Sequence, residues 1–279
     1  MKRLAIGVLL AAGMAGVFMY VGLTRTSEYS RLVEAGDAAL SQDDTFLAIE
    51  AFSGAIALRG DAMLAHLKRG ETYRRHGDLE AAIRDLTRAH SLEPAATRPL
   101  EGLGDVSQQL GRDEDAALYY AAYLAIDNQT PRVLYKLAVA HHHAGRGARA
   151  LPLLRRVIDL APAMPEAHYL LGLALRGQDR QDEAIDALRQ AVVLSPGFTT
   201  AREALGAAFG AAGRADERVE QLEALAALEP ERSQREVDLG LAYAEVGRTD
   251  MAVLSLGRAS EEHPEEAQLY SALGRVWLD

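Results

Sequence analysis

The sequence predicts an all-α protein made of repeated helix pairs behind one apolar segment. Three observations support this prediction. Small and apolar landmarks recur with one fixed period, aromatic residues make up only 6% of a chain rich in Ala, Leu and Gly, and residues 4–23 carry no charge. Ala and Leu favour helices, whereas sheets favour aromatic and β-branched residues. The length of 279 residues suits one or two domains.

The repeat is clearest between Gly70 and Pro94. Its landmarks are Gly70, Tyr73, Gly77, Ala82, Leu86, Ala89 and Pro94. The distance along the chain from Gly36 to Gly70 is repeated in every later copy. It leads from Gly70 to the equivalent positions Gly104, Ala138, Gly172, Gly206 and Gly240, and finally to Gly274 in a partial copy. A fixed period of this length indicates stacked units, none of which buries its apolar face alone.

Each copy is predicted to form two amphipathic helices joined by a tight turn. Gly or Asp stands at the turn, where Gly suits a left-handed backbone. Acidic residues such as Asp78 and Asp113 open the second helix, where the helix dipole favours them, and Pro ends it, as at Pro94. Gly and Ala recur where the two helices should touch most closely, because a larger side chain would hold them apart. Arg218 replaces a usual Ala in the sixth copy, which predicts looser packing there.

This pattern resembles the tetratricopeptide repeat family over about residues 28–279. Departures from the family pattern are Ala138 for the first Gly, and Gly60 and Asn128 where Pro is usual. The resemblance implies a right-handed α-solenoid of about seven helix pairs over residues 28–264. A C-terminal capping helix at residues 265–279 would close it, and one N-terminal transmembrane helix would precede it.

Residues 1–27 are expected to be a membrane anchor, with a span at about residues 4–23 and a short linker. The uncharged residues would form a helix long enough to reach across the ~30 Å hydrocarbon core. Lys2 and Arg3 precede the span, so the amino end should stay in the cytoplasm and the repeats should lie in the periplasm of a bacterial inner membrane. The alternative is cleavage near Gly13-Met14-Ala15, which would release a soluble protein to the periplasm. Ala12 and Gly16 have the spacing of helix-dimerising faces, which leaves an oligomer open.

In the tetratricopeptide family the first helices line a concave groove that binds partner segments. The resemblance places in this groove Lys68, Arg74, Arg75, Arg98, Arg132, Tyr135, Lys136, His142, His143, Tyr169 and Arg176. Seven of these residues are basic, and four acidic residues are expected beside them: Glu71, Glu101, Asp105 and Glu166. The groove is therefore expected to be mildly basic and to suit an acidic or carboxylate-ended protein segment, unless these side chains are simply a solvated polar face.

Some family members hold a peptide carboxylate with a clamp of Lys, Asn, Asn, Lys and Arg. Arg132 and Lys136 match its last two places in type, whereas Leu67, Glu71 and Gly102 occupy the other three. The clamp is therefore incomplete, and we do not expect chaperone-tail binding of that kind.

The run His141–His143 falls at the end of a predicted first helix. His141 takes the position of Tyr73 and Tyr243 in other copies, which predicts a packed side chain. Successive helical residues point in different directions, so three adjacent rings cannot converge on one metal ion. His142 and His143 are expected to face the groove and to gain charge near pH ~6.5, so an acidic partner should bind more tightly in mild acid.

Other function classes are disfavoured by composition and by missing motifs. The net charge of −10 argues against nucleic-acid binding, and the absence of cysteine rules out disulfides and thiolate metal sites. No phosphate loop, HExxH motif or nucleophile elbow is found, so we expect neither an enzyme nor a cofactor. The sequence predicts a membrane-anchored scaffold or assembly factor that binds partner proteins. The alternatives are a non-catalytic regulatory subunit of a membrane enzyme complex and a soluble exported repeat protein.

The topology can be tested with reporters fused after Asp279. Because Lys2 and Arg3 precede the uncharged span, alkaline phosphatase at this end should be active, and a fluorescent protein that matures only in the cytoplasm should stay dark. Fluorescent, phosphatase-negative cells would disprove the predicted orientation.

Overall fold

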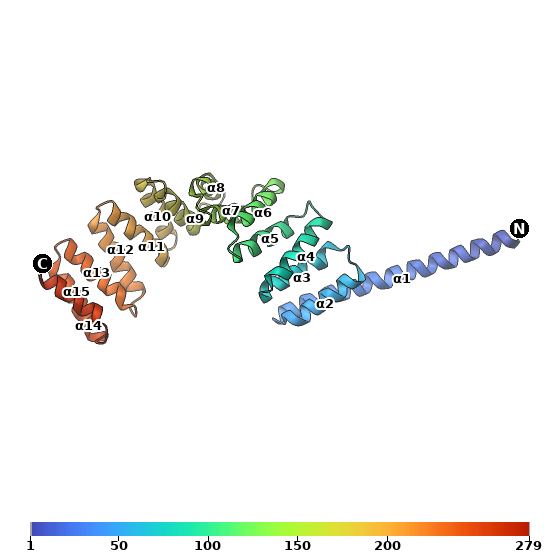
Figure 1. Ribbon diagram of the computed structural model, residues 1–279, viewed down its shortest axis with the longest axis horizontal. Coiled ribbons are helices and arrows are strands. Elements are labelled where there is room, and N and C mark those ends of the chain that lie inside the picture. The colour runs from blue at the N-terminus through green and yellow to red at the C-terminus, as the bar shows by residue number, and fades with distance from the viewer. Residues whose placement is uncertain (1, 279) are drawn as a thin grey trace. The chain divides into compact units, whose positions relative to one another are not determined.

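The computed structural model describes the backbone of residues 2–278 and the side chains of residues 19–20 and 22–277, and over this range it contains helices and no strand. Two compact units divide the chain, Met1–Val133 (unit 1) and Leu134–Asp279 (unit 2) (Figure 1). Unit 1 holds α1 (Lys2–Ser41), α2 (Thr45–Leu58), α3 (Met63–His76), α4 (Leu79–Leu92), α5 (Thr97–Gln109), α6 (Asp113–Ile126) and the start of α7 (Pro131–His143). Unit 2 holds the rest of α7, then α8 (Gly147–Leu160), α9 (Pro165–Arg176), α10 (Gln181–Leu194), α11 (Thr199–Ala211), α12 (Ala215–Leu228), α13 (Ser233–Glu245), α14 (Thr249–Glu262) and α15 (Ala267–Leu278).

Consecutive helices pack as pairs in both units. The pairs are α1 with α2, α3 with α4 and α5 with α6 in unit 1, and α9 with α10, α11 with α12 and α13 with α14 in unit 2. Residues of α7 and α8 share one buried cluster, and α15 lies against α13 and α14. The prediction of an all-α repeat solenoid is thereby confirmed, with α15 in the place of a further first helix.

The turn inside each pair carries one residue with a left-handed backbone, as the sequence predicted. These residues are Asp43, Gly77, Gly111, Gly145, Asp179, Gly213 and Gly247, with φ between 58° and 91°. Gly adopts this conformation without a steric cost, and Asp tolerates it better than most residues. The second helix of each pair begins directly after this turn. The first turns of α2 and α4 are capped by Asp44 and Asp78, which accept hydrogen bonds from the backbone N–H groups of Leu47 and Ala81.

The first helix, α1, is continuous from Lys2 to Ser41 and so runs through residues 24–27, where the sequence suggested a short linker. Its carboxyl-terminal part packs on α2 through the buried side chains of Tyr29 and Val33. Most of the expected span at residues 4–23 lies outside the residues whose side chains are described. Among the described residues, no helix combines the length and apolar character needed to cross a bilayer.

The two helices of a pair approach most closely at the landmark glycine, as predicted. A Cβ atom added to Gly104 would lie only 2.4 Å from Cε1 of Tyr120. Clashes at 2.4–2.9 Å would also occur in the pairs Gly36–Phe52, Gly70–Leu86, Gly172–Leu188 and Gly240–Leu256. The large residue, 16 positions after its glycine, is 0% exposed in all five pairs. We call this glycine the socket and the large residue the plug.

The sixth copy, α11 with α12, departs from this packing. A Cβ atom on Gly206 would lie 3.6 Å from Cβ of Gln221, which is ordinary contact, and Leu222 at the plug position is only partly buried. Arg218 occupies the usual Ala position, and its guanidinium extends to pair with Glu245 at 2.6 Å. The predicted looser packing is confirmed, because a long charged side chain stands where a methyl group fits in most other copies.

Replacing Gly172 with Ala should destabilise the protein, whereas replacing Gly206 with Ala should not. Ala is favoured over Gly in a helix by about 1 kcal/mol. At Gly172, however, the methyl group would lie 2.5 Å from Cγ of Leu188 and 3.1 Å from the carbonyl oxygen of Ala184. Overpacking of this kind costs about 1–3 kcal/mol. The urea midpoint measured by circular dichroism should fall for Gly172→Ala and hold or rise for Gly206→Ala. Equal shifts would refute the socket as a packing constraint.

Candidate partner-binding site

Charged side chains on the first helices of unit 1 form ion pairs from one copy to the next. In each pair a base of one copy donates to an acid of the preceding copy. The pairs are Lys68 with Asp37 at 2.6 Å, Arg98 with Glu71 at 2.9 Å, and Arg132 with Glu101 at 2.9 Å. We call these three pairs the ion-pair ladder. They run over α1, α3, α5 and the start of α7, and the last three of these carry residues that were predicted to line the groove.

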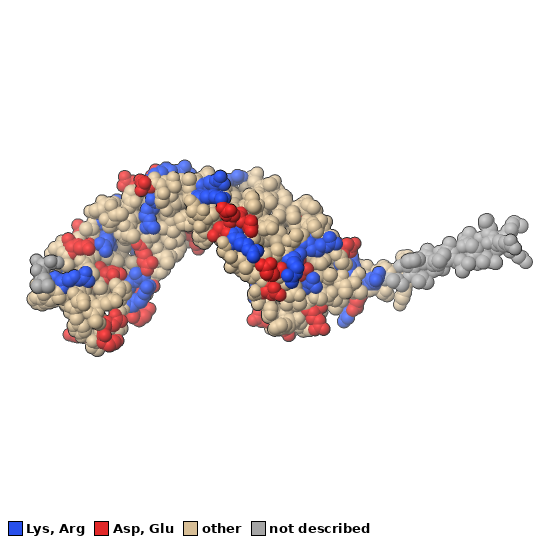
Figure 2. Space-filling view, viewed as in Figure 1, with Lys and Arg blue, Asp and Glu red and all other residues tan. Residues whose placement is uncertain are grey.

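A pocket of about 250 Å³ lies beside the ladder. It is lined by Glu71, Arg74, Arg98, Glu101, Gly102, Asp105 and Arg132. Three arginines meet three carboxylates here, so the formal charge of the lining is zero, whereas the whole groove was expected to be mildly basic. Figure 2 likewise shows acidic and basic side chains alternating on the visible face of unit 1, with no continuous basic field.

The plug of the third copy, Tyr120, holds one of the carboxylates that line this pocket. The hydroxyl group of Tyr120 donates to Asp105 Oδ1 at 2.7 Å. Burial, with a further contribution from the Asp105 carboxylate, raises the pKa of Tyr120, so the phenol stays protonated and remains a donor. One residue thus fills a socket with its ring and orients a pocket carboxylate with its hydroxyl group. In the sequence, Tyr120 takes the place of the landmark Leu86 in the third copy, which indicated packing alone.

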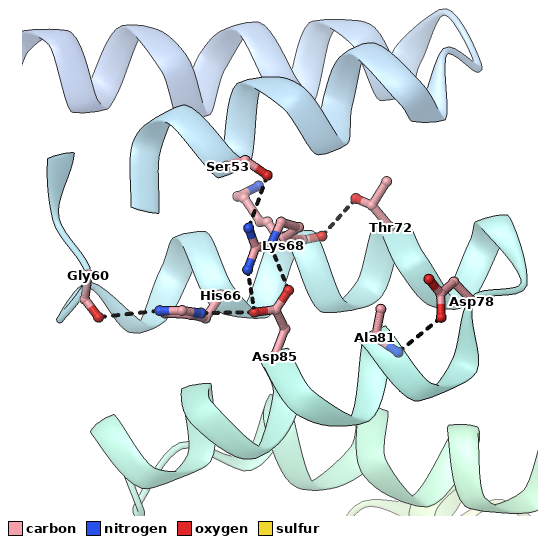
Figure 3. A network of polar contacts seen from close by, with 9 residues as sticks. Ser53, Gly60, His66, Lys68, Thr72, Asp78, Ala81 and Asp85 are labelled. Carbon is pink, nitrogen blue, oxygen red and sulfur yellow. Dashed lines mark hydrogen bonds and ion pairs between the residues drawn. The ribbon is translucent and has the colours of Figure 1, made fainter. Parts of the chain in front are cut away.

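A buried polar network holds α3 in place next to the ladder (Figure 3). Arg69 of α3 donates to both oxygens of Asp85 of α4, at 2.6 and 2.8 Å, and to the hydroxyl group of Ser53 of α2 at 3.0 Å. The ring of His66 lies between Asp85, at 3.0 Å, and the carbonyl oxygen of Gly60, at 3.3 Å. A buried carboxylate is stable only with such donors. The network fixes the helix that carries Lys68, Arg74 and Arg75, and sequence reasoning did not find it.

In unit 2, the predicted aromatic residues of the groove lie on α7 and α9. Burial raises the pKa of Tyr135, and the nearby Glu166 and Tyr169 raise it further. The ring of Tyr169 packs against Phe198 with ring centroids 5.2 Å apart. Lys136 is half-buried on α7, next to Tyr135. Tyr169 therefore lies near enough to affect Tyr135, and its contact with Phe198 was not suggested by the sequence.

Two further predicted groove residues lie at the ends of their helices. Arg75 is exposed in the last turn of α3, and Arg176 is exposed in the last turn of α9. The predicted set therefore divides between the units. Unit 1 holds the five basic residues from Lys68 to Arg132, and unit 2 holds the aromatic residues, the histidines, Lys136 and Arg176.

A family model described as tetratricopeptide repeat matches residues 33–90, 67–131, 125–165 and 135–197. Together these matches cover residues 33–197, which is more than half of the chain. The chain belongs to the tetratricopeptide repeat family. Membership implies a scaffold for protein–protein interaction. A comparison with curated proteins finds no match.

Solved tetratricopeptide structures share this fold. MamA from Desulfovibrio magneticus RS-1 (residues 41 to the end) is 25% identical, with a TM-score of 0.59 over 61% of this chain and 96% of that one. YrrB, described as a tetratricopeptide protein with an unusual peptide-binding site, is 21% identical, with a TM-score of 0.59 over 67% of this chain and 97% of that one. The C-terminal part of a repeat protein from Cytophaga hutchinsonii is 15% identical, with a TM-score of 0.73 over 86% and 98%.

The carboxylate clamp of some tetratricopeptide proteins is not formed here. Leu67 is buried in the core cluster of α3 to α5, and a Cβ atom on Gly102 would already lie 3.0 Å from Leu86, so these positions leave no room for polar clamp side chains. Arg132 is engaged by Glu101. This tetratricopeptide protein therefore presents paired charges where the clamp would present free donors.

The three histidines have different surroundings in the structure. Burial lowers the pKa of His141, with Arg149 and Arg146 adding to the effect, and the side chain is partly buried as predicted for a packing position. Burial also lowers the pKa of His142, with His143 adding, and their ring centroids are 6.2 Å apart. Our expectation that His142 would gain charge near its ordinary pKa is therefore corrected.

We expect His142 to titrate below pH ~6.5 in a histidine ring NMR titration. Its lowered pKa means that the folded state favours the neutral ring. The corresponding stability is fully present above the unfolded pKa and is lost as pH falls through the folded pKa. The His142→Ala variant should therefore lose less thermal stability than the parent between neutral pH and mild acid. A His142 midpoint at or above the ordinary value would disprove this.

Proposed function

We propose that this tetratricopeptide protein is a membrane-anchored scaffold or assembly factor that binds an acidic segment of a partner protein along its first helices. The observation that carries the proposal is the unequal exposure of two of the three ladder pairs, since in the Lys68 pair the acid Asp37 is the more exposed member. The side chain of Arg98 is 61% exposed while that of its partner Glu71 is 32% exposed, and Arg132 is 63% exposed while Glu101 is 13% exposed. In both pairs the guanidinium group faces solvent and the carboxylate lies deeper.

An acidic segment would bind by sharing these arginines with the carboxylates beneath them. A guanidinium group has five N–H donors, so one Arg can serve two carboxylates. Each exposed ion pair contributes only about 0.2–1 kcal/mol, so several contacts must act together, and the complex should weaken with salt. In unit 2 the rings of Tyr135 and Tyr169 offer apolar contact area of their own to a partner protein.

The anchored part of the proposal rests on residues 4–23. Lys2 and Arg3 precede this uncharged stretch, which supports a single-pass anchor in a bacterial inner membrane with the repeats in the periplasm. Release to the periplasm after cleavage near Ala15 is the alternative, and the mass of the mature amino end distinguishes the two. A non-catalytic regulatory subunit is the second alternative. Purification in mild detergent would then yield one enzyme in equal amounts, whereas a scaffold would yield several clients.

Charge reversal of the ladder tests partner binding. A crosslinking pull-down first identifies the bound protein, and its affinity is then measured for Arg98→Glu/Arg132→Glu. We expect a loss of about tenfold or more, because two attractive contacts become repulsive. The parent complex should also weaken as salt is raised.

Arg112→Glu is the matched control. Arg112 also pairs with an acid of the preceding copy, Glu80, and is 48% exposed, but it does not line the pocket. The control should bind like the parent. If the double reversal keeps full affinity while its circular dichroism is unchanged, the partner binds elsewhere and the proposal fails.

A further inference from the structure

The last helix of the described chain exposes an aromatic stripe. Tyr270, Gly274 and Trp277 follow one another at helical spacing on α15, and the two aromatic residues are 50% and 74% exposed. A Cβ atom on Gly274 would meet no atom within 4 Å. The opposite face of α15 is buried in the core of unit 2 through Leu269, Ala272 and Val276. One face of α15 is therefore packed, and the other is open around a glycine.

In the copies whose socket is filled, this stripe is the contact between the two helices of a pair. On α13 the equivalent residues are Glu236, Gly240 and Tyr243, and α14 covers them with its plug Leu256 in the socket of Gly240. Tyr243, at the position of Trp277, is only 5% exposed. Gly274 is thus an empty socket, since no second helix lies over α15 in the part of the chain that the structure describes.

The residue before the plug adds a polar contact in two complete copies. Asp85 precedes the plug Leu86 and bonds His66, and Ser255 precedes the plug Leu256 and donates to Glu236. His66 and Glu236 hold the position that Tyr270 holds on α15. A helix over α15 would therefore place a large apolar residue over Gly274 and a polar residue beside Tyr270, whose hydroxyl group donates to the carbonyl oxygen of Ser260 on α14 at 3.5 Å.

We propose that α15 binds an amphipathic helix of a partner protein, which acts as the second helix of an eighth pair. The partner helix carries a polar residue followed by a Leu, Phe or Tyr plug, the residue types found at the filled sockets of this chain. This surface is separate from the ion-pair ladder, which lies in unit 1. Binding here recognises an apolar helix face, whereas binding at the ladder recognises charge.

A second copy of this chain is a poorer occupant. The second helices of the described chain already lie on their own first helices, and the plugs at the clashing sockets are completely buried. A second copy could lend one of them only by opening a pair. Its own α15 offers Trp277, which is larger than any of the plugs Phe52, Leu86, Tyr120, Leu188 and Leu256.

The experiment uses Trp277, the only tryptophan of the chain, as the reporter. The probe is an acetylated and amidated peptide of residues 249–262, which is the helix that covers α13. It is titrated into the full-length protein in mild detergent. We expect a saturable blue shift of the emission, because the indole ring moves from water into an apolar contact.

Two peptide variants test the plug with the same loss of side-chain atoms. Leu256→Ala removes the plug, and Leu254→Ala removes a side chain that is 68% exposed on α14 and so faces away from the first helix. We expect Leu256→Ala to bind about tenfold more weakly or worse, and Leu254→Ala to bind like the parent peptide.

A variant of the protein tests the socket itself. Gly274→Leu should abolish the blue shift of the Trp277 emission, because the leucine side chain fills the socket.

A chain extended by residues 246–264 directly after Asp279 serves as the positive control, since this keeps the register of the repeat. Its emission should already be blue-shifted. Three results would each overturn the proposal: no shift with the peptide, equal affinity for the two Leu→Ala peptides, or a shift that persists in a folded Gly274→Leu protein. A fourth result concerns the protein without peptide. If its emission shifts with protein concentration and it sediments as a dimer, α15 binds a second copy of the chain, and the proposal is also overturned.

Discussion

The close approach of two helices at a glycine is the constraint on which the rest of this structure depends. At the sockets of Gly36, Gly104, Gly172 and Gly240 even one added carbon would overlap the plug. The helices of a pair can therefore lie close enough to bury a whole Phe, Tyr or Leu between them, and the constant period of the repeat keeps each plug opposite its socket. Because neighbouring copies make most of the contacts, the charged side chains of successive first helices come within reach of one another.

The fold could be predicted from the sequence because its determinants are local and repeated. Gly or Asp at the turn, Pro after the second helix and Gly at the close contact each have a steric reason that holds from copy to copy. The polar contacts were harder to predict. Lys68 was recognised as basic, but its partner Asp37 lies in the preceding copy and was not included in the predicted groove. The contact of Arg69 and His66 with Asp85 depends on which face of α3 turns towards α4, and residue types alone do not fix that.

Pairing changes what the groove can recognise. A count of residue types suggested a positive field, but the bases and acids alternate along the first helices and cancel locally. Recognition then depends on which member of each pair is the more accessible, and in the Arg98 and Arg132 pairs of the ladder this is the arginine. The same reasoning applies to the histidines, since burial at the end of α7 keeps His142 neutral over a wider range of pH than its sequence position suggested.

The incompletely filled socket of the sixth copy makes the stabilisation of unit 2 uneven along the chain. In an array whose copies are held mainly by their neighbours, local opening begins where the contacts are weakest. Here that is α11 with α12, where Leu222 is incompletely buried and Arg218 replaces a methyl-sized residue. Because α12 shares one buried cluster with α13, α14 and α15, whereas α11 packs in a cluster with α10, helices α12 to α15 form a terminal segment that can open while the copies before it stay folded. Hydrogen exchange would reveal this segment as a cooperative unit of its own, and a helix bound on α15 would add to the stability of that unit alone.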